Sequence, residues 1–560
     1  MGDAGVPQYH IKSAWHSKRR HLRIITIGAG ATGLLAAYKT QKLLQNVELA
    51  IYEKNSDIGG TWHENKYPGC ACDVPAHIYT YSFEPNPDWS SYYAGSAEIK
   101  QYFVNFAEKY DLNKYICLNS KVLSAVWDED KGIYRLAVDR NGSVTTDWCH
   151  VLINGTGVLS RWKWPSIPGL HDFNGTLVHS ANWDESIKPD GKRVAIIGTG
   201  SSAIQIVPQI QPKVKQLVSF MRSVTWISPP FLADSLTPGS SSGSSNDYSE
   251  GDKQHWRQHP EELLMYRKKL EADFNGMFDM FLRDSPASKQ AEESMRTEMH
   301  RRIGPGNEEL KQKLIPTWPP GCRRLTPGEG YLEALVKNNV TRVHKEIVKV
   351  TAEGVVDDSQ HLHEVDTIIC ATGFDVSFRP SFSVIGVDGA DMAREFDPHP
   401  HVYLGIAVPK FPNYFTVNGV LGSWTVGTAL NSIEACLDYI FQCVSRIQSE
   451  DIRALEVKLE PIKDLYTHAD EWHKGSVWGA DCTSWYKNEA AGGKVMAWGG
   501  SALHYIKTME LVRWEHYAFR YNAQNSWAFL GNGQVEAEIM RDKDGLSPYI
   551  RNADQPWSIA

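Results

Sequence analysis

Two glycine-rich segments have the residue types and the spacing that hold a dinucleotide. The first is Gly28-Ala29-Gly30-Ala31-Thr32-Gly33, and the second is Gly198-Thr199-Gly200-Ser201-Ser202-Ala203. Glycines at these spacings permit a tight turn and let the backbone approach a pyrophosphate, whose charge faces the N-terminus of the following helix. Two dinucleotide sites in one chain indicate electron transfer between the two bound molecules.

The elements that must position the first segment can be identified around it. Residues 22–27 are typical of a buried parallel strand, residues 34–38 continue as a helix, and residues 47–53 are a second strand that ends in Glu53. A carboxylate at this distance after the glycines can hydrogen-bond ribose hydroxyls. A further glycine pair, Gly59-Gly60, precedes Thr61 and Trp62. It suits a long dinucleotide such as FAD, and a plain surface turn is the alternative.

The second segment follows a buried strand at residues 193–197 and opens a helix on which Gln205 is also expected to contact cofactor. The next strand, residues 216–221, ends in Arg222-Ser223 and not in an acid. An acid would repel a 2′-phosphate, whereas an arginine and a hydroxyl would bind it. We therefore expect NADP(H) rather than NAD(H), with a surface role for Arg222 as the alternative.

The order of these elements predicts an α/β fold with two Rossmann-like dinucleotide-binding domains and a helical insertion. The charged helical stretch is expected to cover the substrate cleft, and a Ser/Gly-rich linker at 238–246 precedes it. Residues 239–243 match the hydrolase pattern G-x-S-x-G but lack its strand and helix, so we reject a nucleophile elbow. The expected division is an N-terminal arm (1–21), an FAD-binding domain (22–160 and 366–560), an NADP-binding domain (161–230 and 322–365) and the insertion (231–321).

Composition excludes several classes of function. The 560 residues carry a net charge of -8, which argues against a nucleic-acid partner. Nine cysteines, an odd number spread along the chain, fit reduced thiols better than a disulfide framework. Cys70-Ala71-Cys72 lacks metal-site spacing, so we expect no metal. No run reaches about 18 apolar residues, and we expect a cytoplasmic protein without a membrane span or an evident protein partner.

The segment between the two glycine loops carries a resemblance. Residues 173–184 match F-x-G-x-x-x-H-x-x-x-W-[PD] at every fixed position, with His179 and Trp183 among them. This pattern resembles the fingerprint of the type I (class B) flavin-dependent Baeyer–Villiger monooxygenases, and the likeness runs from about residue 22 to beyond 488. Residues 67–73 and 82–87 are most similar to fungal members of secondary-metabolite pathways. Related N- and S-oxygenating enzymes have Phe or Tyr in place of Trp183.

The resemblance implies an FAD- and NADPH-dependent enzyme that inserts one atom of O2 next to a ketone carbonyl, through a C4a-peroxyflavin, to give an ester or lactone. Alternatives are an N- or S-oxygenating flavin monooxygenase and a flavin reductase for a thiol or a protein, although no CxxC is present. The ketone itself is not identified by the sequence.

The resemblance also implies roles for individual residues. Arg324 would be the catalytic arginine, which cannot deprotonate, and Asp73 its partner. Arg323 would help to hold the 2′-phosphate, and Trp485 would belong to a loop over the nicotinamide, with surface-cation and core-aromatic roles as their alternatives. His179 and Trp183 would link the domains and arrange NADP without performing chemistry. Other implied FAD contacts are Ala71, Cys72, Tyr79 and Val122.

Overall fold

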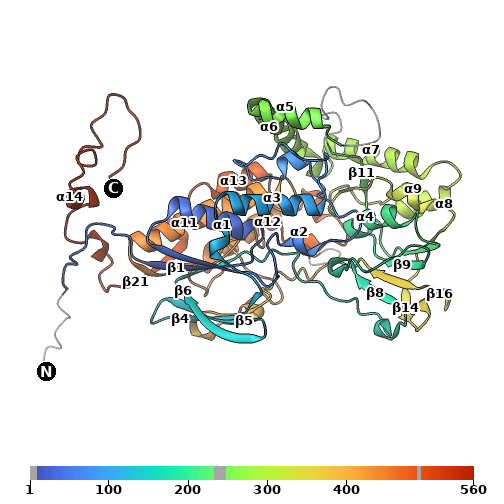
Figure 1. Ribbon diagram of the computed structural model, residues 1–560, viewed down its shortest axis with the longest axis horizontal. Helices are drawn as coiled ribbons and strands as arrows, with labels where there is room; N and C mark the ends of the chain where they lie inside the picture. Colours follow the sequence, from blue (N-terminus) through green and yellow to red (C-terminus); the bar gives the residue numbers. More distant parts are fainter. Residues whose placement is uncertain (1–8, 232–246, 488–492, 560) are drawn as a thin grey trace.

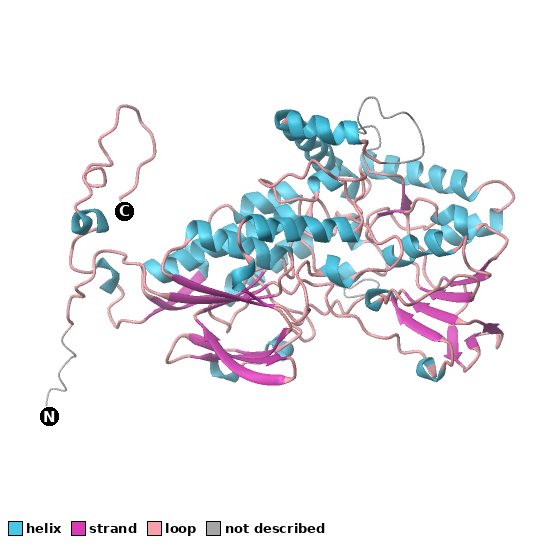
Figure 2. Cartoon of the chain, in the orientation of Figure 1, coloured by secondary structure: helices cyan, strands magenta, loops and turns pink. Residues whose placement is uncertain are grey.

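The computed structural model describes residues 9–231, 247–487 and 493–559 (Figure 1). Two parallel sheets lie side by side along the long axis of the molecule, the first toward the left of Figure 1 and the second toward the right. Figure 2 shows the strands mainly in the lower half of the view and the helices mainly in the upper half. The predicted α/β class is confirmed.

The first sheet forms around the first glycine loop. Its order is β19-β7-β1-β2-β3, and every pair in it is parallel. The helix α1 (Ala31–Leu43) begins within the glycine segment, with Gly30 as its N-cap, and α11 (Ala429–Ser449) packs against α1. These elements have the predicted strand–glycine loop–helix–strand order. The strands are β1 (Leu22–Ile27), β2 (Val47–Tyr52), β3 (Ile116–Cys117), β7 (Val151–Asn154) and β19 (Tyr414–Thr416).

The second sheet has the order β13-β10-β9-β17-β8 and is also parallel. Its glycine loop joins β9 to α4 (Ser201–Ile210). The strand β17 pairs with β9 and β8, so the return to the first domain, expected at residue 366, falls after this strand. The sequence of β17 shows only a buried apolar strand, and such a strand can belong to either of the two parallel sheets. The strands are β8 (Thr176–His179), β9 (Arg193–Ile197), β10 (Gln216–Phe220), β13 (Val340–Val343) and β17 (Thr367–Cys370).

Smaller sheets flank the two large ones. The predicted antiparallel pair at residues 121–127 and 134–139 is confirmed as β4 (Ser120–Asp128) and β5 (Ile133–Arg140). Further small-sheet strands are β6 (Ser143–Cys149), β11 (Ile227–Ser228), β12 (Thr326–Pro327), β14 (Ile347–Val350), β15 (Gly354–Asp357), β16 (Leu362–Glu364), β18 (Ser383–Ile385), β20 (Ile452–Val457) and β21 (Tyr517–Tyr521).

The predicted helical insertion is confirmed between β11 and β12. It comprises α5 (Glu250–Gln258), α6 (Pro260–Gly276), α7 (Pro286–Ile303) and α8 (Glu308–Leu314). It docks on the first unit around buried His77, whose ring lies 4.4 Å from that of Trp256, while Arg267 Nε donates to the His77 carbonyl at 3.0 Å. The linker at 238–246 and the rejected hydrolase pattern lie outside the described residues.

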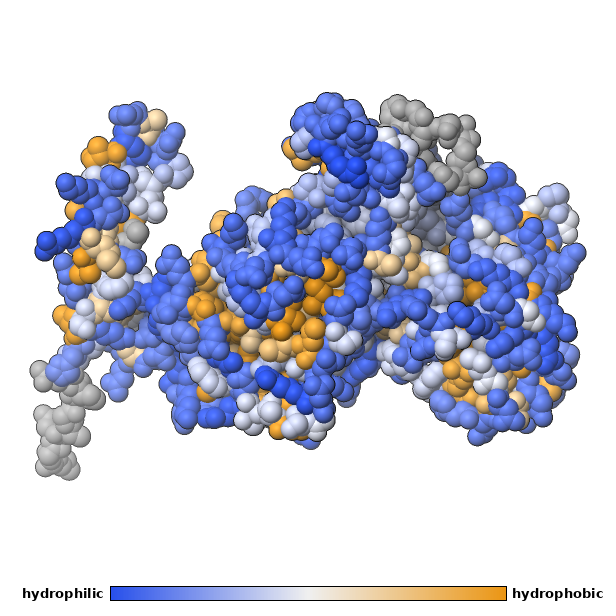
Figure 3. Space-filling model, in the orientation of Figure 1, coloured by the Kyte–Doolittle hydropathy of each residue, from blue (hydrophilic) through white to orange (hydrophobic). Residues whose placement is uncertain are grey.

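Segments near the two ends of the chain lie together on the left of Figure 1. Backbone hydrogen bonds join residues 14–17 to 529–534, among them His16 N to Gln534 O at 2.7 Å. Figure 3 shows apolar side chains on this projecting segment, where Ile550 is 75% exposed. Other helices are α2 (Thr61–Glu64), α3 (Ser96–Lys109), α9 (Tyr331–Leu335), α10 (Met392–Glu395), α12 (Leu459–His473), α13 (Ala502–Met509) and α14 (Glu536–Met540). In the described part of the chain, no helix is both long and apolar enough to span a bilayer.

The expectation that the cysteines are all reduced is wrong for one pair. Cys322 and Cys482 form a disulfide across 160 residues of sequence. The fold brings two loops together here, and neither the number of cysteines nor their spacing reports such an approach. The other seven cysteines are unpaired.

Candidate active site

The first glycine loop needs glycine for steric reasons. A Cβ on Gly33 would stand 2.0 Å from the carbonyl oxygen of Gly28, and Gly28 has a φ of +97°. The buried Glu53 carboxylate accepts hydrogen bonds from the backbone N–H groups of Ala29 and Asn55, both at 2.8 Å. The predicted ribose-binding acid therefore also fixes the loop that would face the pyrophosphate.

A cavity of about 630 Å³ opens beside this loop, a size suited to a large organic ligand. Most of the predicted site residues line it together, although they come from widely separated segments. The predicted residues that line this cavity are Gly28, Gly30, Glu53, Gly60, Thr61, Trp62, Ala71, Cys72, Asp73, Tyr79, Val122, Ser201, Ser202, Gln205, Arg324 and Trp485.

Three features of the cavity fit FAD. A Cβ on Gly30 would lie only 3.4 Å from the Cα of Gly60, so two bare glycine turns share one wall. The N-terminus of α11 reaches the cavity through Ala429 and Leu430, and helix N-termini favour anionic groups. Finally, Oδ1 of buried Asn418, another lining residue, has no hydrogen-bond partner among the described residues.

Arg324 and Asp73 form a two-point ion pair at this cavity. Arg324 Nη2 donates to Asp73 Oδ1 at 2.6 Å, and Nε donates to Oδ2 at 2.5 Å. Burial opposes the charge on Arg324, but the Asp73 carboxylate outweighs it and raises the pKa of the guanidinium well above its ordinary value. The side chain is still 37% exposed. A permanent, oriented positive charge therefore borders the cavity.

The Trp485 segment closes the same end of the cavity. Trp485 lines it in a short 3-10 turn, and its ring centroid lies 6.3 Å from that of Trp424. Arg324 Nη1 donates to the Trp424 carbonyl at 3.5 Å. Residues 418–429, which include Trp424 and Asn418, were not anticipated. Their signal was a glycine-containing turn followed by a long amphipathic helix, the arrangement already used to find the other two loops.

The second glycine loop also needs glycine for steric reasons, because a Cβ on Gly198 would lie 2.3 Å from the Ala371 carbonyl oxygen. Thr199 Oγ1 donates to the Ser223 carbonyl at 2.6 Å, and Arg323 Nη1 donates to Ser223 Oγ at 3.2 Å. Arg222 is exposed beside them. The structure thus gathers, at the end of β10, the groups predicted to hold a 2′-phosphate. This group lies outside the cavity lining, as do Gly200 and buried Ala203.

Gln205 connects the two units. From α4, its Nε2 donates to the Ala71 carbonyl at 2.9 Å, and its Oε1 accepts from Tyr67 OH at 2.8 Å. Gly69 makes this approach possible, since a Cβ there would lie 2.6 Å from the Gln205 carbonyl oxygen. The helix that would face NADP is therefore in contact with the segment that would face FAD.

The fingerprint residues, 173–184, do not line the cavity. The His179 ring is fully buried and stacks on Trp162, with centroids 4.7 Å apart. Its Nδ1 accepts from Ala181 N–H at 3.2 Å, and burial lowers its pKa to about 4, so the ring is neutral at physiological pH. Trp183 is buried in a core cluster that also includes Tyr67. Both side chains are therefore packed in the protein interior, where the two units meet.

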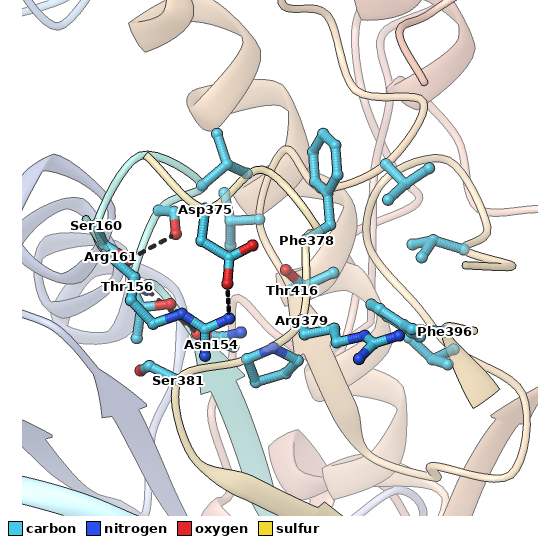
Figure 4. A pocket seen from close by; sticks show the side chains of 18 of the residues that line it. Asn154, Thr156, Ser160, Arg161, Asp375, Phe378, Arg379, Ser381, Phe396 and Thr416 are labelled. Carbon is cyan, nitrogen blue, oxygen red and sulfur yellow. Dashed lines mark hydrogen bonds and ion pairs between the residues drawn. The ribbon is translucent and has the colours of Figure 1, made fainter. Parts of the chain in front are cut away.

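A second cavity, of about 40 Å³, lies where the chain crosses between the units (Figure 4). Figure 4 shows Arg161 and Asp375 facing one another as an ion pair, one from each crossing segment. Ser160, Arg161 and Ser381 border both cavities. The two cavities thus share part of their walls.

Comparison with known proteins agrees with this geometry. Residues 21–234 match the flavin-binding monooxygenase-like family. The FAD-binding monooxygenase tazF of Aspergillus terreus is 40% identical over 531 residues, which span 94% of this chain and 94% of the relative. A Baeyer–Villiger monooxygenase of Pseudomonas aeruginosa is 33% identical over 485 residues, or 86% of this chain and 88% of the relative.

Solved structures share the fold. The closed crystal structure of a cyclohexanone monooxygenase superposes with a TM-score of 0.77 at 24% identity, covering 90% of this chain and 100% of the other. The cyclohexanone monooxygenase of Rhodococcus sp. Phi1 bound to NADP+ superposes equally well. The chain therefore belongs to the flavin-binding monooxygenase-like family, together with fungal FAD-binding monooxygenases and bacterial Baeyer–Villiger monooxygenases.

Proposed function

We propose that this protein is an FAD- and NADPH-dependent Baeyer–Villiger monooxygenase, which converts a ketone to an ester or lactone with one oxygen atom from O2. The observation that carries the proposal is the Arg324–Asp73 pair, placed on the same cavity as the first glycine loop and Trp485. When bound, FAD would accept hydride from NADPH and activate O2, which is chemistry that no side chain supplies.

The residues of the chain have three tasks in this proposal. The glycine loops and Glu53 bind and orient the dinucleotides, and Arg323 with Ser223 and Arg222 selects NADPH by its 2′-phosphate. Arg324 keeps a negative oxygen in its ionised form, because a guanidinium does not give up its proton. Asp73 holds the Arg324 fork in one orientation. Trp485, Trp424 and Tyr486 exclude water from this end of the cavity.

The substrate class is proposed from a small cavity on the other side of Arg324. Its volume is about 40 Å³, and Arg323, Arg324 and Tyr486 border it. Its other large apolar side chains are Leu325 and five from the helical insertion: Phe231, Phe274, Met277, Met280 and Phe281. Methionines can rearrange around different apolar shapes, and aromatic rings pack on planar ligands. The apolar lining supports an apolar ketone and gives the insertion a part in substrate choice.

Other expectations remain part of the proposal. We propose the division into an arm, two dinucleotide-binding domains and an insertion, with β17 assigned to the NADP domain. A role in fungal secondary metabolism is supported by the 40% identity with the fungal relative. A cytoplasmic location stays a prediction, and the Cys322–Cys482 pair weakens the cysteine argument for it. Cell fractionation would test it.

A substrate screen tests the function. Purified holoprotein would be given NADPH, O2 and ketones of increasing size, with matched amines and sulfides in parallel, and products would be examined by mass spectrometry. We expect a gain of one oxygen on ketones only, with an ester or lactone as the product. Oxygenation of the amines or sulfides without any ester would replace this proposal with the N- or S-oxygenating alternative. NADPH oxidation without an oxygenated product from any class would contradict both.

A further inference from the structure

The Cys322–Cys482 disulfide joins the two segments that the proposed function depends on. Cys322 directly precedes Arg323 and Arg324, and Cys482 lies three residues before Trp485. Both cysteines are buried, with exposures of 0% and 4%. The bond therefore ties the arginine segment to the tryptophan segment next to the cavity.

The tryptophan segment also contacts the arginine segment through side chains: Arg324 hydrogen-bonds Tyr486, and Lys487 Nζ lies 3.9 Å from Cys322 Sγ. Its backbone hydrogen bonds are local: Cys482 N–H donates to the Ala480 carbonyl at 2.9 Å, Lys487 N–H to Ser484 O at 2.9 Å, and the Tyr486 carbonyl accepts from Met496 N–H at 2.7 Å. None of these three bonds reaches residues 321–325. The disulfide adds a covalent link to these side-chain contacts, three residues before Trp485.

A buried cation lies beside the sulfur atoms. Lys487 is 1% exposed, its Nζ lies 3.9 Å from Cys322 Sγ, and it donates to the Ala480 carbonyl at 2.5 Å. An ammonium at this distance favours the thiolate form of a cysteine, which is the nucleophilic form. Cys322 is thereby distinguished from the other cysteines as the first to react.

We propose that Cys322 and Cys482 are a peroxide-oxidised thiol pair whose disulfide holds the Trp485 segment against the Arg324 segment. The oxidant is hydrogen peroxide, which forms when NADPH and O2 are consumed without oxygenation of a ketone, so this step rests on the proposed function. The chain neighbours of Cys322, Gly321 and Arg323, border the small cavity beside Arg324. Hydrogen peroxide is small enough to enter a space of that size, whereas large reductants are not.

The reaction balances with hydrogen peroxide alone. The Cys322 thiolate attacks one peroxide oxygen, an S–O bond forms, the O–O bond breaks, and the departing hydroxide takes a proton from Lys487 and leaves as water. The Cys482 thiol then attacks the Cys322 sulfenic acid. An S–S bond forms, the S–O bond breaks, and the thiol proton leaves with the hydroxide as a second water. Overall, the Cys322 thiolate and the Cys482 thiol lose two electrons, Lys487 gives up one proton, and one hydrogen peroxide becomes two waters.

The pair is tested first without turnover. Fully reduced holoprotein would be treated with hydrogen peroxide, labelled with N-ethylmaleimide and mapped as non-reduced peptides. We expect a cross-linked peptide that contains Cys322 and Cys482, while Cys117 stays labelled. In Cys482→Ser, dimedone should trap Cys322 as the sulfenic acid. Labelling of Cys322 and Cys482 that persists as long as that of Cys117 overturns the proposal.

Two further measurements test whether the disulfide holds the Trp485 segment in place, which we call the tether. Tryptic cleavage after Lys487 should be several-fold faster in reduced than in oxidised wild-type protein. In Cys482→Ser, which cannot form the disulfide, cleavage should be equally fast before and after treatment with hydrogen peroxide. Cys117→Ser should match the wild type in both states. During ketone turnover, the hydrogen peroxide released per NADPH should likewise rise several-fold when the pair is reduced. Equal cleavage and equal release in the two redox states overturn the tether. The proposed function is judged separately, by ester formation from the reduced enzyme.

Discussion

Replacement of Arg324 by alanine separates the two halves of the proposed reaction. The variant loses the charge that is expected to stabilise a negative oxygen, while the residues expected to bind NADPH stay intact. Removing one such electrostatic group typically costs 10²–10³ in rate, or about 2.7–4 kcal/mol. The Arg324 side chain is 37% exposed and shares its charge with Asp73, so solvent and the carboxylate reduce its field. We therefore take about 2–3 kcal/mol, or roughly 30- to 150-fold in oxygenation.

The assay follows both steps on one preparation. Anaerobic stopped-flow absorbance reports NADPH-dependent bleaching of the bound cofactor, which we expect to stay within about threefold of wild type. Ester formation from a ketone, followed by mass spectrometry, should show the loss. Arg324→Lys keeps a charge but cannot form the two-point pair, so its rate of ester formation should lie between those of the wild type and Arg324→Ala. Arg135→Ala, on a solvent-exposed ion pair, should change neither step. Ester formation by Arg324→Ala at the wild-type rate would refute the reasoning, as would equal losses in both steps.

Four other predictions concern cofactor choice, coupling, acid stability and the first glycine loop. Arg222→Ala should raise the KM for NADPH about tenfold and leave that for NADH unchanged, since a phosphate contact by a charged donor contributes about 1.5 kcal/mol or more; equal effects would reject its role. His179→Ala should raise the hydrogen peroxide released per NADPH at constant flavin content, and unchanged coupling would deny the fingerprint a function. Buried His77 has no hydrogen-bond partner for either ring nitrogen, and its pKa is lowered to about 3. The unfolded chain therefore binds the proton first as the pH falls below about 6.5, and stability declines from there toward pH 3, by about 2 kcal/mol at pH 5. The protection factors of the α5 amides, which correct for the slower intrinsic exchange at low pH, should fall between pH 7 and 5 in the wild type and less in His77→Phe, and the same pH response in both would contradict this origin. Gly33→Ala should abolish FAD retention, measured as bound flavin absorbance, because its Cβ would meet the Gly28 carbonyl at 2.0 Å, whereas Gly200→Ala, whose Cβ meets nothing within 4 Å, should retain FAD.

Local patterns in the sequence determined the elements and their chemistry. Glycines followed by a helix, and an acid at the end of the next strand, predicted the first nucleotide-binding unit because each feature depends on residues within one supersecondary unit. The structure confirms the strands and helices around both loops. It also places Glu53 at the first loop and Ser223 at the second. The pattern at residues 173–184, which includes Trp183, carried the resemblance to a family, and sequence comparison supports that family over most of the chain.

Tertiary structure decided what depends on distant segments meeting. The Arg324–Asp73 pair spans 251 residues, and the bridge from Gln205 to Ala71 spans 134, distances over which sequence spacing has no geometric meaning. The place of β17 in the second sheet, the cavity wall at residues 418–429 and the Cys322–Cys482 bond have the same origin. Which strand pairs with which, and which loops touch, follows from packing of the whole chain. The sequence by itself therefore determined what the site is made of, and the fold decided which residues share it.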